Sequence, residues 1–288
     1  MAVTAKHFFS ADAVEVDAVE ECEFFSSLKM RNGTFKLTRP SRFADLNAEI
    51  ASIVERRSSD LREVLDIGAS TGSTTIELVD FLNTLGGSPK VVGTDLFIDA
   101  HLVELLPGLR VLADAEGWPL QYDVAGLAVR AWVRRLDYLT FAVGPRLLAR
   151  ALVRPHLRRK MLTGRTRPVR MESRALASRG VKLVENDIFT LTPSFVGRFD
   201  FVRAANILNI GYFPTDRMVL AISNIRSYCR GPGAMVLVAR SVGPAQHDGT
   251  LFELTDGGRF EVRARVGKGS EIEPLVLGAR EAAARRSP

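Results

Sequence analysis

The segment Val64-Leu-Asp-Ile-Gly-Ala-Ser-Thr-Gly-Ser-Thr-Thr-Ile-Glu-Leu78 decides the fold of this chain. It predicts a buried strand, a tight turn and a helix start between residues 70 and 75, without interruption. Gly68 and Gly72 carry no Cβ and can take backbone angles closed to other residues, so a ligand can approach the main chain there. The hydroxyl-rich helix start would offer the same ligand its N–H groups and the positive end of the helix dipole.

A second strand follows at a spacing that suits nucleoside binding. The apolar run Val91-Val-Gly-Thr ends in Asp95, which lies 23 residues beyond Gly72. In mononucleotide-binding βαβ units, a carboxylate that reaches the ribose hydroxyls lies about 20 residues beyond the glycine turn. A glycine turn alone occurs in many α/β proteins. Together with Asp95, it predicts half of a nucleoside-binding site.

An acidic residue in the first strand argues against a dinucleotide as the ligand. Dinucleotide-binding turns have the pattern Gly-x-Gly-x-x-Gly, whereas the order here is Asp66-x-Gly68-x-Ser70-x-Gly72. A carboxylate at Asp66 would repel a pyrophosphate, and it suits a ligand that carries an amine.

This turn resembles the first motif of the class I S-adenosylmethionine-dependent methyltransferases, usually Asp/Glu-x-Gly-x-Gly-x-Gly, with Ser70 in place of the middle glycine. The resemblance implies a Rossmann-like, doubly wound α/β fold with a mostly parallel sheet, and S-adenosyl-L-methionine as cofactor. It also implies which residues contact that cofactor: Asp66, Gly68, Ala69, Ser70, Gly72, Asp95 and Leu96 from the first two strands, and Asp187, Ile188 and Ala205 from later ones.

A third strand is predicted over Val181–Phe189. Together with the fourth strand described below, it completes the strand order expected of that family. Asp187 resembles the acidic residue that accepts the adenine amino hydrogens in that family. An aspartate after a strand also commonly caps a turn, and this alternative stays open.

The fourth strand and the loop above it are predicted over Phe199–Phe213. Ligands of parallel sheets bind beyond the carboxyl ends of the strands, so this loop is expected to face the methyl group. Asn206, Asn209 and Tyr212 are therefore candidates for positioning the methyl acceptor. The two asparagines could instead cap the helix that follows.

Part of this region has a more specific resemblance. Arg203-Ala-Ala-Asn-Ile-Leu-Asn-Ile-Gly-Tyr-Phe213, with the turn Arg230-Gly-Pro-Gly-Ala before Met235–Ala239, is similar to the chemotaxis-receptor methyltransferase pattern Arg-Asn-Val-Leu-Ile-Tyr-Phe. The match is partial, because two alanines separate the arginine from the asparagine here. The fold and the cofactor carry over, and a glutamyl substrate does not.

Composition agrees with one enzyme-sized unit. The chain has 288 residues, of which 46% are apolar and 25% charged, so it can bury a substantial core. Cys22 and Cys229 are too far apart in sequence to form a metal-ligand motif, and the four histidines are dispersed, so we expect neither a metal site nor a disulfide framework. The N-terminal residues lack the apolar core of a signal peptide, which predicts a cytoplasmic protein.

Positive charge is concentrated in one segment. Residues 101–180 contain fifteen Lys and Arg against six Asp and Glu, within a chain of net charge +6. The same segment separates the second predicted strand from the third by far more than the dozen or so residues of a crossover helix. We therefore expect an insertion over 101–179, forming a basic, amphipathic helical cap.

Two stretches of the insertion carry the helical pattern, 124–143 and a second in which Arg146, Arg150 and Arg154 recur at four-residue steps. Such helices suit peripheral membrane contact through residues 124–160, a pocket for a hydrophobic substrate with an anionic group, or an ordinary lid packed on the sheet. These three interpretations stay open. No run of 18 apolar residues exists to span a bilayer, and the absence of a recognisable binding module disfavours nucleic acid.

The expected domain organisation follows from these segments. It consists of an N-terminal helical region over 1–59, a methyltransferase domain over 60–100 and 180–278, the inserted cap over 101–179 and a fraying tail over 279–288. The N-terminal region contains a helix over Pro40–Arg56 capped by Ser41. The methyltransferase domain closes with an antiparallel hairpin of Thr250–Thr255 with Arg259–Val266.

The predicted function is methyl transfer from S-adenosyl-L-methionine to a small-molecule or lipid-like acceptor, in the cytoplasm or peripherally at the membrane. The alternative is a non-catalytic protein that binds the cofactor or a partner on the same fold. No catalytic base is named, because a carboxylate acceptor would need none. His101 and His156 are expected at the surface or in the cap.

Overall fold

The computed structural model describes residues 2–10, 16–36, 41–243 and 246–278. The chain forms two compact units, each built from two chain segments. Unit 1 consists of Met1–Arg39 and Phe97–Ser173, and unit 2 of Pro40–Leu96 and Arg174–Pro288. None of the described helices has the length and apolar character that a membrane crossing requires. The predicted tail over 279–288 lies outside the described residues.

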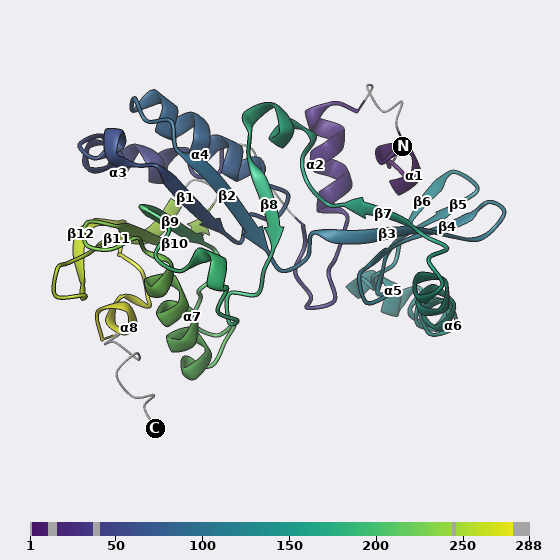
Figure 1. Cartoon of the computed structure of the whole chain (residues 1–288). Coiled ribbons are helices and arrows are strands. Elements are labelled where there is room, and N and C mark those ends of the chain that lie inside the picture. The colour runs from purple at the N-terminus through teal and green to yellow at the C-terminus, as the bar shows by residue number, and fades with distance from the viewer. Residues whose placement is uncertain (1, 11–15, 37–40, 244–245, 279–288) are drawn as a thin grey trace. The chain divides into compact units, whose positions relative to one another are not determined.

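Unit 2 is built on a seven-stranded sheet of order β12-β11-β10-β9-β1-β2-β8 (Figure 1). Its strands are β1 (Glu63–Ile67), β2 (Lys90–Asp95), β8 (Lys182–Glu185), β9 (Phe201–Ala205), β10 (Met235–Gly243), β11 (Gln246–Leu254) and β12 (Phe260–Val266). The five strands from β8 to β10 in this order run parallel, whereas β11 and β12 pair antiparallel with their neighbours. The sheet is therefore mostly parallel, with an antiparallel extension at one side.

The strand order places a topological switch point beside β1. From β1 the chain runs outward to β2 and β8, then returns to β9 and continues outward to β10 on the other side. β1 and β9 pair directly, with Asp66 opposite Arg203. Ligands of open α/β sheets bind beyond the carboxyl ends of the strands at such a point. The expected ligand site is thus the region that follows Ile67 and Ala205.

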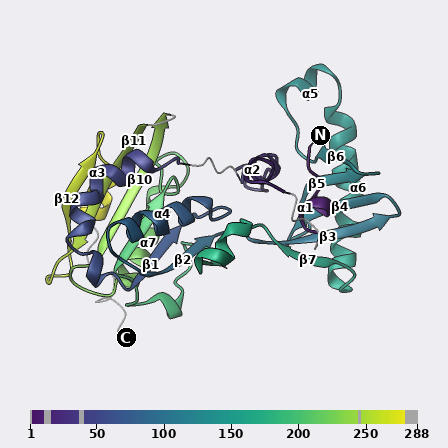
Figure 2. The same cartoon turned by 90° about the horizontal axis from the view of Figure 1, so that it is seen from above.

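Helices cover both faces of this sheet. α3 (Ala44–Glu55) and α4 (Ser73–Thr84) lie on one face, and α7 (Thr215–Tyr228) and α8 (Glu273–Gly278) on the other (Figures 1 and 2). The short 3₁₀ helices are η2 (Ser58–Asp60), η3 (Arg174–Arg179) and η4 (Pro193–Phe195). Apolar side chains of β9, β10, α7 and α8 form one core cluster. The sheet is thus buried on both faces, as its apolar strands require.

The start of α3 differs from the sequence prediction. The helix begins at Ala44, its N-cap position is Phe43, and no side chain caps it. Ser41 lies in a turn with φ of +58°, so it is not the predicted cap. Pro40, the predicted first residue, is outside the described residues.

Unit 1 contains a five-stranded antiparallel sheet of order β6-β5-β4-β3-β7. Its strands are β3 (Asp99–Leu106), β4 (Leu109–Asp114), β5 (Pro119–Val124), β6 (Leu127–Arg130) and β7 (Arg167–Arg170). Its helices are α1 (Ala5–Phe8), α2 (Ala18–Ser26), α5 (Arg135–Leu139) and α6 (Val143–Leu162). α1 and α2 lie over one face of this sheet, and α5 and α6 over the other (Figure 1).

Alternate residues of the unit 1 strands pack into two separate hydrophobic cores, one on each face of the sheet. Leu102 and Leu112 pack with Phe8, Phe24 and other side chains of the N-terminal segment. Their sequence neighbours pack on the opposite face, where Val103, Val111 and Tyr122 meet Leu157 of α6. This alternation is the period-two pattern of strands with two buried faces.

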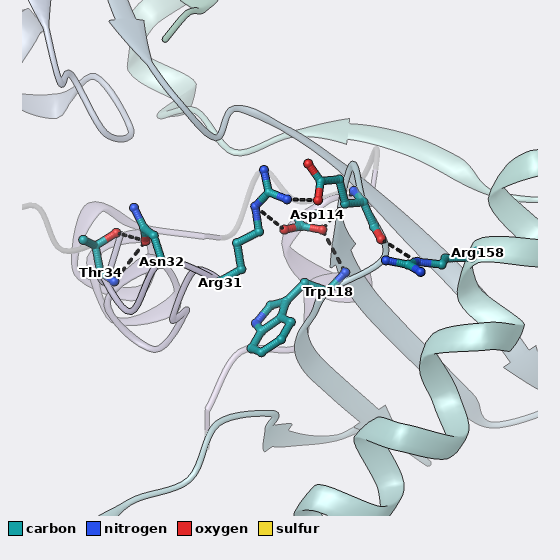
Figure 3. A network of polar contacts seen from close by, with 7 residues as sticks. Arg31, Asn32, Thr34, Asp114, Trp118 and Arg158 are labelled. Atoms are coloured by element: carbon teal, nitrogen blue, oxygen red, sulfur yellow. Dashed lines mark hydrogen bonds and ion pairs between the residues drawn. The ribbon is translucent and has the colours of Figure 1, made fainter. Parts of the chain in front are cut away.

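Polar contacts also tie the N-terminal segment to the β4–β5 turn (Figure 3). Arg31 forms ion pairs with Asp114 and Glu116. Asp114 Oδ1 in turn accepts a hydrogen bond of 2.8 Å from the Trp118 N–H. At the far end of the segment, the Ala5 N–H donates to Gln121 Oε1 at 2.7 Å. These contacts explain why residues 1–39 belong to the same unit as the insertion and form no region with 40–59.

The insertion is not the helical cap that the sequence predicts, since most of its first half is strand. Residues 124–143 contain no long helix, because Ala125 and Gly126, with φ of +51° and +86°, reverse the chain between β5 and β6. The second predicted stretch, with Arg146 to Arg154, lies inside α6. The two-sided burial of the strands obscured their alternation in the sequence.

Candidate functional site

The turn between β1 and α4 has a left-handed residue at every second position. Gly68, Ser70 and Gly72 have φ of +77°, +56° and +88°. Ser70 therefore keeps the conformation that the glycine of the resembled motif would adopt, although serine takes it less readily. The Gly68 and Ala69 N–H groups both donate to the Thr94 carbonyl, at 2.8 and 2.9 Å. The turn is thereby fixed to the end of β2.

The two segments singled out in the sequence meet at Asp95. The Ser70 N–H donates to Asp95 Oδ2 at 2.9 Å, so the carboxylate that ends β2 lies against the glycine turn that follows β1. The next residue, Leu96, is 41% exposed. An acidic side chain and an exposed apolar side chain therefore lie beside the turn. Asp95 suits the hydroxyls of a ribose, and Leu96 suits the face of an adenine ring.

The contacts that Asp66 makes in the structure lie inside the fold. It is only 2% exposed, and its carboxylate accepts from Arg203 Nε at 2.8 Å and Nη2 at 2.7 Å. A third hydrogen bond of 2.6 Å comes from Thr75 Oγ1. These contacts give Asp66 a structural role inside the fold, and its contact with a ligand amine stays a prediction.

The glycines of the turn are covered by side chains. A Cβ placed on Gly72 would lie 2.7 Å from Leu176 Cδ2, and Leu176 is buried. A Cβ on Gly68 would lie 3.2 Å from Ile207 Cδ1. Gly72 thus makes room for the end of the Leu176 side chain, and its contact with the cofactor stays a prediction. At Gly68 the neighbour is the flexible end of a partly buried side chain, so a ligand can reach the main chain once Ile207 shifts.

Asp187 and Ile188 follow β8 as predicted. Their hydrogen bonds in the structure are with other residues of the chain. Asp187 Oδ1 accepts from the Phe189 N–H at 3.0 Å, which is the turn-capping alternative. Ile188 is 5% exposed within the core, and its carbonyl accepts from Asn224 Nδ2 at 2.8 Å. Ala69 and Ala205 are buried as well. An adenine contact through Asp187 stays a prediction.

The three acceptor-positioning candidates are not brought together. Asn206, with φ of +61°, uses its Oδ1 to accept from the Ser241 N–H at 2.7 Å, and thereby joins the ends of β9 and β10. Asn209 contributes its carbonyl to a 3.2 Å bond from the Tyr212 N–H. Tyr212 itself is 70% exposed. Asn206 is thus a support of the loop, whereas Asn209 and Tyr212 lie on its surface.

A polar cluster that the sequence did not reveal surrounds Asn206. Ser241 Oγ accepts from Arg42 Nε at 3.1 Å and lies 3.2 Å from His247 Nδ1. The His247 Nε2 atom is buried and has no hydrogen-bond partner among the described residues. The ring of Phe43 lies 5.4 Å from the His247 ring. Arg42 and Phe43 lie in the first turn of the predicted helix over Pro40–Arg56, and nothing in that pattern indicates a contact with residue 247.

Charge near the turn is compensated inside the fold. Burial raises the pKa of Glu77 above its ordinary value, and the Ser41 N–H and the Arg203 guanidinium oppose that shift. The Arg203 Nη1 atom has no hydrogen-bond partner among the described residues, and its guanidinium lies 5.2 Å from the Phe43 ring. The buried Asp66–Arg203 pair and the partly buried Glu77 of α4 thus form one charge group.

Histidines and metal ligands do not form a second centre in the part of the chain that the structure describes. No group of three His, Cys, Asp or Glu side chains there could hold a metal ion. His101 Nδ1 lies 3.0 Å from Thr166 Oγ1 in unit 1, and His156 is exposed on α6.

Comparison with known proteins gives structural likeness only. No family model and no curated protein matches the sequence. Among solved structures, SAM-bound CalS10, an amino pentose methyltransferase from Micromonospora echinaspora involved in calicheamicin biosynthesis, matches with 15% identity over 82% of this chain and 81% of that chain, at a TM-score of 0.34. The CcbJ methyltransferase from Streptomyces caelestis matches with 16% identity over 83% and 79%, at a TM-score of 0.33.

Other matches cover less of the matched chain. The CMeT domain of the citrinin polyketide synthase has 15% identity and a TM-score of 0.27, over 62% of this chain and 28% of that chain. In three such matches this chain spans between 28% and 47% of the other chain. All these TM-scores are below 0.5, so the fold assignment rests on the strand order and the turn geometry described above.

Proposed function

We propose that the protein is an S-adenosylmethionine-dependent methyltransferase that acts on a small-molecule or lipid-like acceptor. The observation that carries the proposal is the 2.9 Å hydrogen bond from the Ser70 N–H to the Asp95 carboxylate. It joins a left-handed turn after the central strand to an acidic residue at the end of the neighbouring strand, next to the switch point of the sheet. This is the place and the donor set that a nucleoside requires.

The residues around Asp95 fit the adenosine part of the cofactor. Asp95 would accept the ribose hydroxyls, Leu96 would cover one side of the adenine, and Asp187 would accept its amino hydrogens. The main chain from Gly68 to Ser70 would face the methionine part once Ile207 moves aside. The cofactor, when bound, supplies a methyl group activated by a sulfonium. Asp66 would support the site from beneath, because Arg203 and Thr75 hold its carboxylate inside the fold.

The task of the chain is to hold an acceptor atom in line with that methyl group in a site without water. Asn206 fixes the loop after β9 to Ser241, so the wall of this site is rigid at that point. Asn209 and Tyr212, further along the loop, are the groups we assign to acceptor positioning. A carboxylate acceptor needs no base. For a hydroxyl acceptor, the unpartnered His247 Nε2 is the candidate proton acceptor.

Calorimetry with S-adenosylmethionine and S-adenosylhomocysteine tests the cofactor assignment. We expect binding by the native chain and at least about tenfold weaker binding by Asp95→Ala, because a buried pair of ribose hydroxyls would lose its charged acceptor. Asp256→Ala is the matched control, since Asp256 is exposed in the β11–β12 turn of the same unit. Equal affinity in native chain and Asp95→Ala would contradict the proposal.

Transfer of a labelled methyl group from the cofactor to fractions of a cell extract tests the activity. Label in a small-molecule or lipid fraction, absent with Asp95→Ala, is the expected result. Cofactor binding without any transfer would favour the alternative, a non-catalytic protein that binds the cofactor or a partner on this fold.

A further inference from the structure

The segment from α5 to α6 exposes an unusual number of large apolar side chains. Seven of them are between 57% and 88% exposed: Leu136, Tyr138, Leu139, Phe141, Leu148, Leu152 and Leu162. They fall within 27 residues of unit 1, on α5, on α6 and on the short link between these helices. Apolar side chains scattered singly on a surface need no explanation, whereas a concentration of this kind marks an interaction surface.

The charged side of α6 faces the sheet in part, which inverts the pattern of an ordinary surface helix. Arg146 forms an ion pair with the buried Asp137. The guanidinium carbons of Arg150 and Arg154 lie 4.6 and 5.3 Å from the centre of the Trp118 ring. Leu148 and Leu152, on the other side of the helix, are left to the exterior. α6 therefore packs on the unit 1 sheet through Leu157 and places some of its arginines on the same side.

Positive charge around these leucines is neutralised only in part, by Asp137, which pairs with Arg146. Residues 138–171 contain nine Lys and Arg and no Asp or Glu. No described carboxylate lies within ion-pair distance of Arg150 or Arg154. A surface groove of about 530 Å³ on α6 is lined by Arg154, Arg158 and Arg159 together with Ala151, Pro155 and Leu162. Guanidinium groups and apolar side chains thus alternate on one surface.

We propose that residues 135–162 form a docking surface for a membrane that contains anionic phospholipids. The leucines and Phe141 would enter the boundary between head groups and acyl chains, and the exposed Arg158 and Arg159 would contact lipid phosphates. A second copy of this surface is a poor partner, because both copies would carry the same unneutralised charge. Nucleic acid would pair with the arginines but would leave the aliphatic side chains in water. The proposal does not depend on methyl transfer.

Sedimentation of the full chain with lipid vesicles tests this proposal. We expect pelleting with an equal mixture of phosphatidylglycerol and phosphatidylcholine at low salt, and little with phosphatidylcholine alone. High salt should weaken the binding, because a basic residue near an anionic membrane gains only a screened attraction. No pelleting with the anionic vesicles at low salt would overturn the proposal.

A pair of double variants separates the apolar contribution from general basicity. Leu148→Gln with Leu152→Gln should reduce the partition coefficient by at least about tenfold, since two side chains would no longer enter the apolar boundary. Leu106→Gln with Leu127→Gln is the matched control, because both leucines are exposed on the sheet of the same unit. Equal pelleting of the two double variants would overturn the proposal. A competition with duplex DNA gives a further test. If DNA displaces the chain from the vesicles and the Leu148/Leu152 double variant still pellets, the proposal is overturned.

Discussion

Arg203 is the residue whose role is hardest to infer from the sequence. It is fully buried in β9, within the apolar stretch Phe201-Val-Arg-Ala-Ala205, and it forms two hydrogen bonds with Asp66. Removing one partner of a buried pair leaves an uncompensated charge, while replacing both partners by apolar groups is often neutral. Breaking the Asp66–Arg203 pair should therefore lower the free energy of unfolding mainly because one buried charge is left without a partner.

We predict that Arg203→Met lowers the free energy of unfolding by about 3–5 kcal/mol, because the Asp66 carboxylate is left buried without its counter-charge. Adding Asp66→Leu should recover most of that loss. Arg230→Met, which breaks the partly exposed pair with Asp200, should cost less than about 1 kcal/mol. Urea denaturation measures all three, and a double variant no more stable than Arg203→Met would contradict the prediction.

The two cysteines should differ sharply in reactivity. Burial raises the pKa of the Cys229 thiol to about 12, so the reactive thiolate is absent at any pH at which the protein is handled. Cys22 is only partly buried. A Cys22→Ser variant should therefore resist a thiol-labelling reagent at pH 8 and take up one label in denaturant. Labelling of the folded variant would contradict this prediction, because it would show that the end of α7 opens and exposes the Cys229 thiol.

At the scale of the elements, the turn from β1 to α4 depends on Gly72 for two reasons. Its φ of +88° strains any other residue, and Leu176 occupies the space of a Cβ. Gly72→Ala should therefore destabilise more than Gly86→Ala, which has a φ of +80° but nothing within 4 Å. The control should cost about 1–2 kcal/mol, the strain of a left-handed residue alone. Equal losses in thermal unfolding would mean that Leu176 moves freely.

The first turns of α4 also contain a pH-dependent element. The pKa of Glu77 is raised in the folded chain, so its charged form is disfavoured there and folding is most stable while it is protonated. That contribution is fully present below the unfolded pKa, near 4.5, and is lost as the pH rises through the higher folded pKa.

Glu77→Gln should therefore stabilise the chain at neutral pH and have little effect at pH 4, since glutamine can still accept the Ser41 N–H. The gain is reduced by solvent screening, because Glu77 is only about half buried. Chemical denaturation at both pH values provides the test. A destabilisation at neutral pH would show that the interaction with Arg203 outweighs desolvation.

Elements whose apolar residues recur at one regular spacing could be predicted from the sequence. Strands with two buried faces could not. The turn after β1 and the acidic end of β2 were predictable, because their residues are local and their types are restrictive. The strands β3 to β6 were not, since both faces carry apolar residues and the alternation disappears. The partners of Asp66 and Asn206 were also hidden, because Arg203 and Ser241 lie 137 and 35 residues further along the chain.

For the molecule as a whole, the division into two units predicts independent folding of unit 2. Its sheet and its core cluster are formed by residues of 40–96 and 174–288 only. A chain in which residue 96 is joined to residue 174 by a short Gly/Ser linker, and residues 1–39 are removed, should unfold cooperatively. It should also keep the affinity of the full chain for S-adenosylmethionine. Gradual unfolding by circular dichroism would contradict this prediction.

The tie between Ala5 and Gln121 has a consequence for synthesis on the ribosome. The aromatic rings of Phe8, Phe24 and Phe25, which pack against one another, emerge early but cannot be covered until β4 and β5 have been translated. At about 5–20 residues per second the delay is roughly 5–20 s, during which the first aromatic cluster of the nascent chain stays exposed to water.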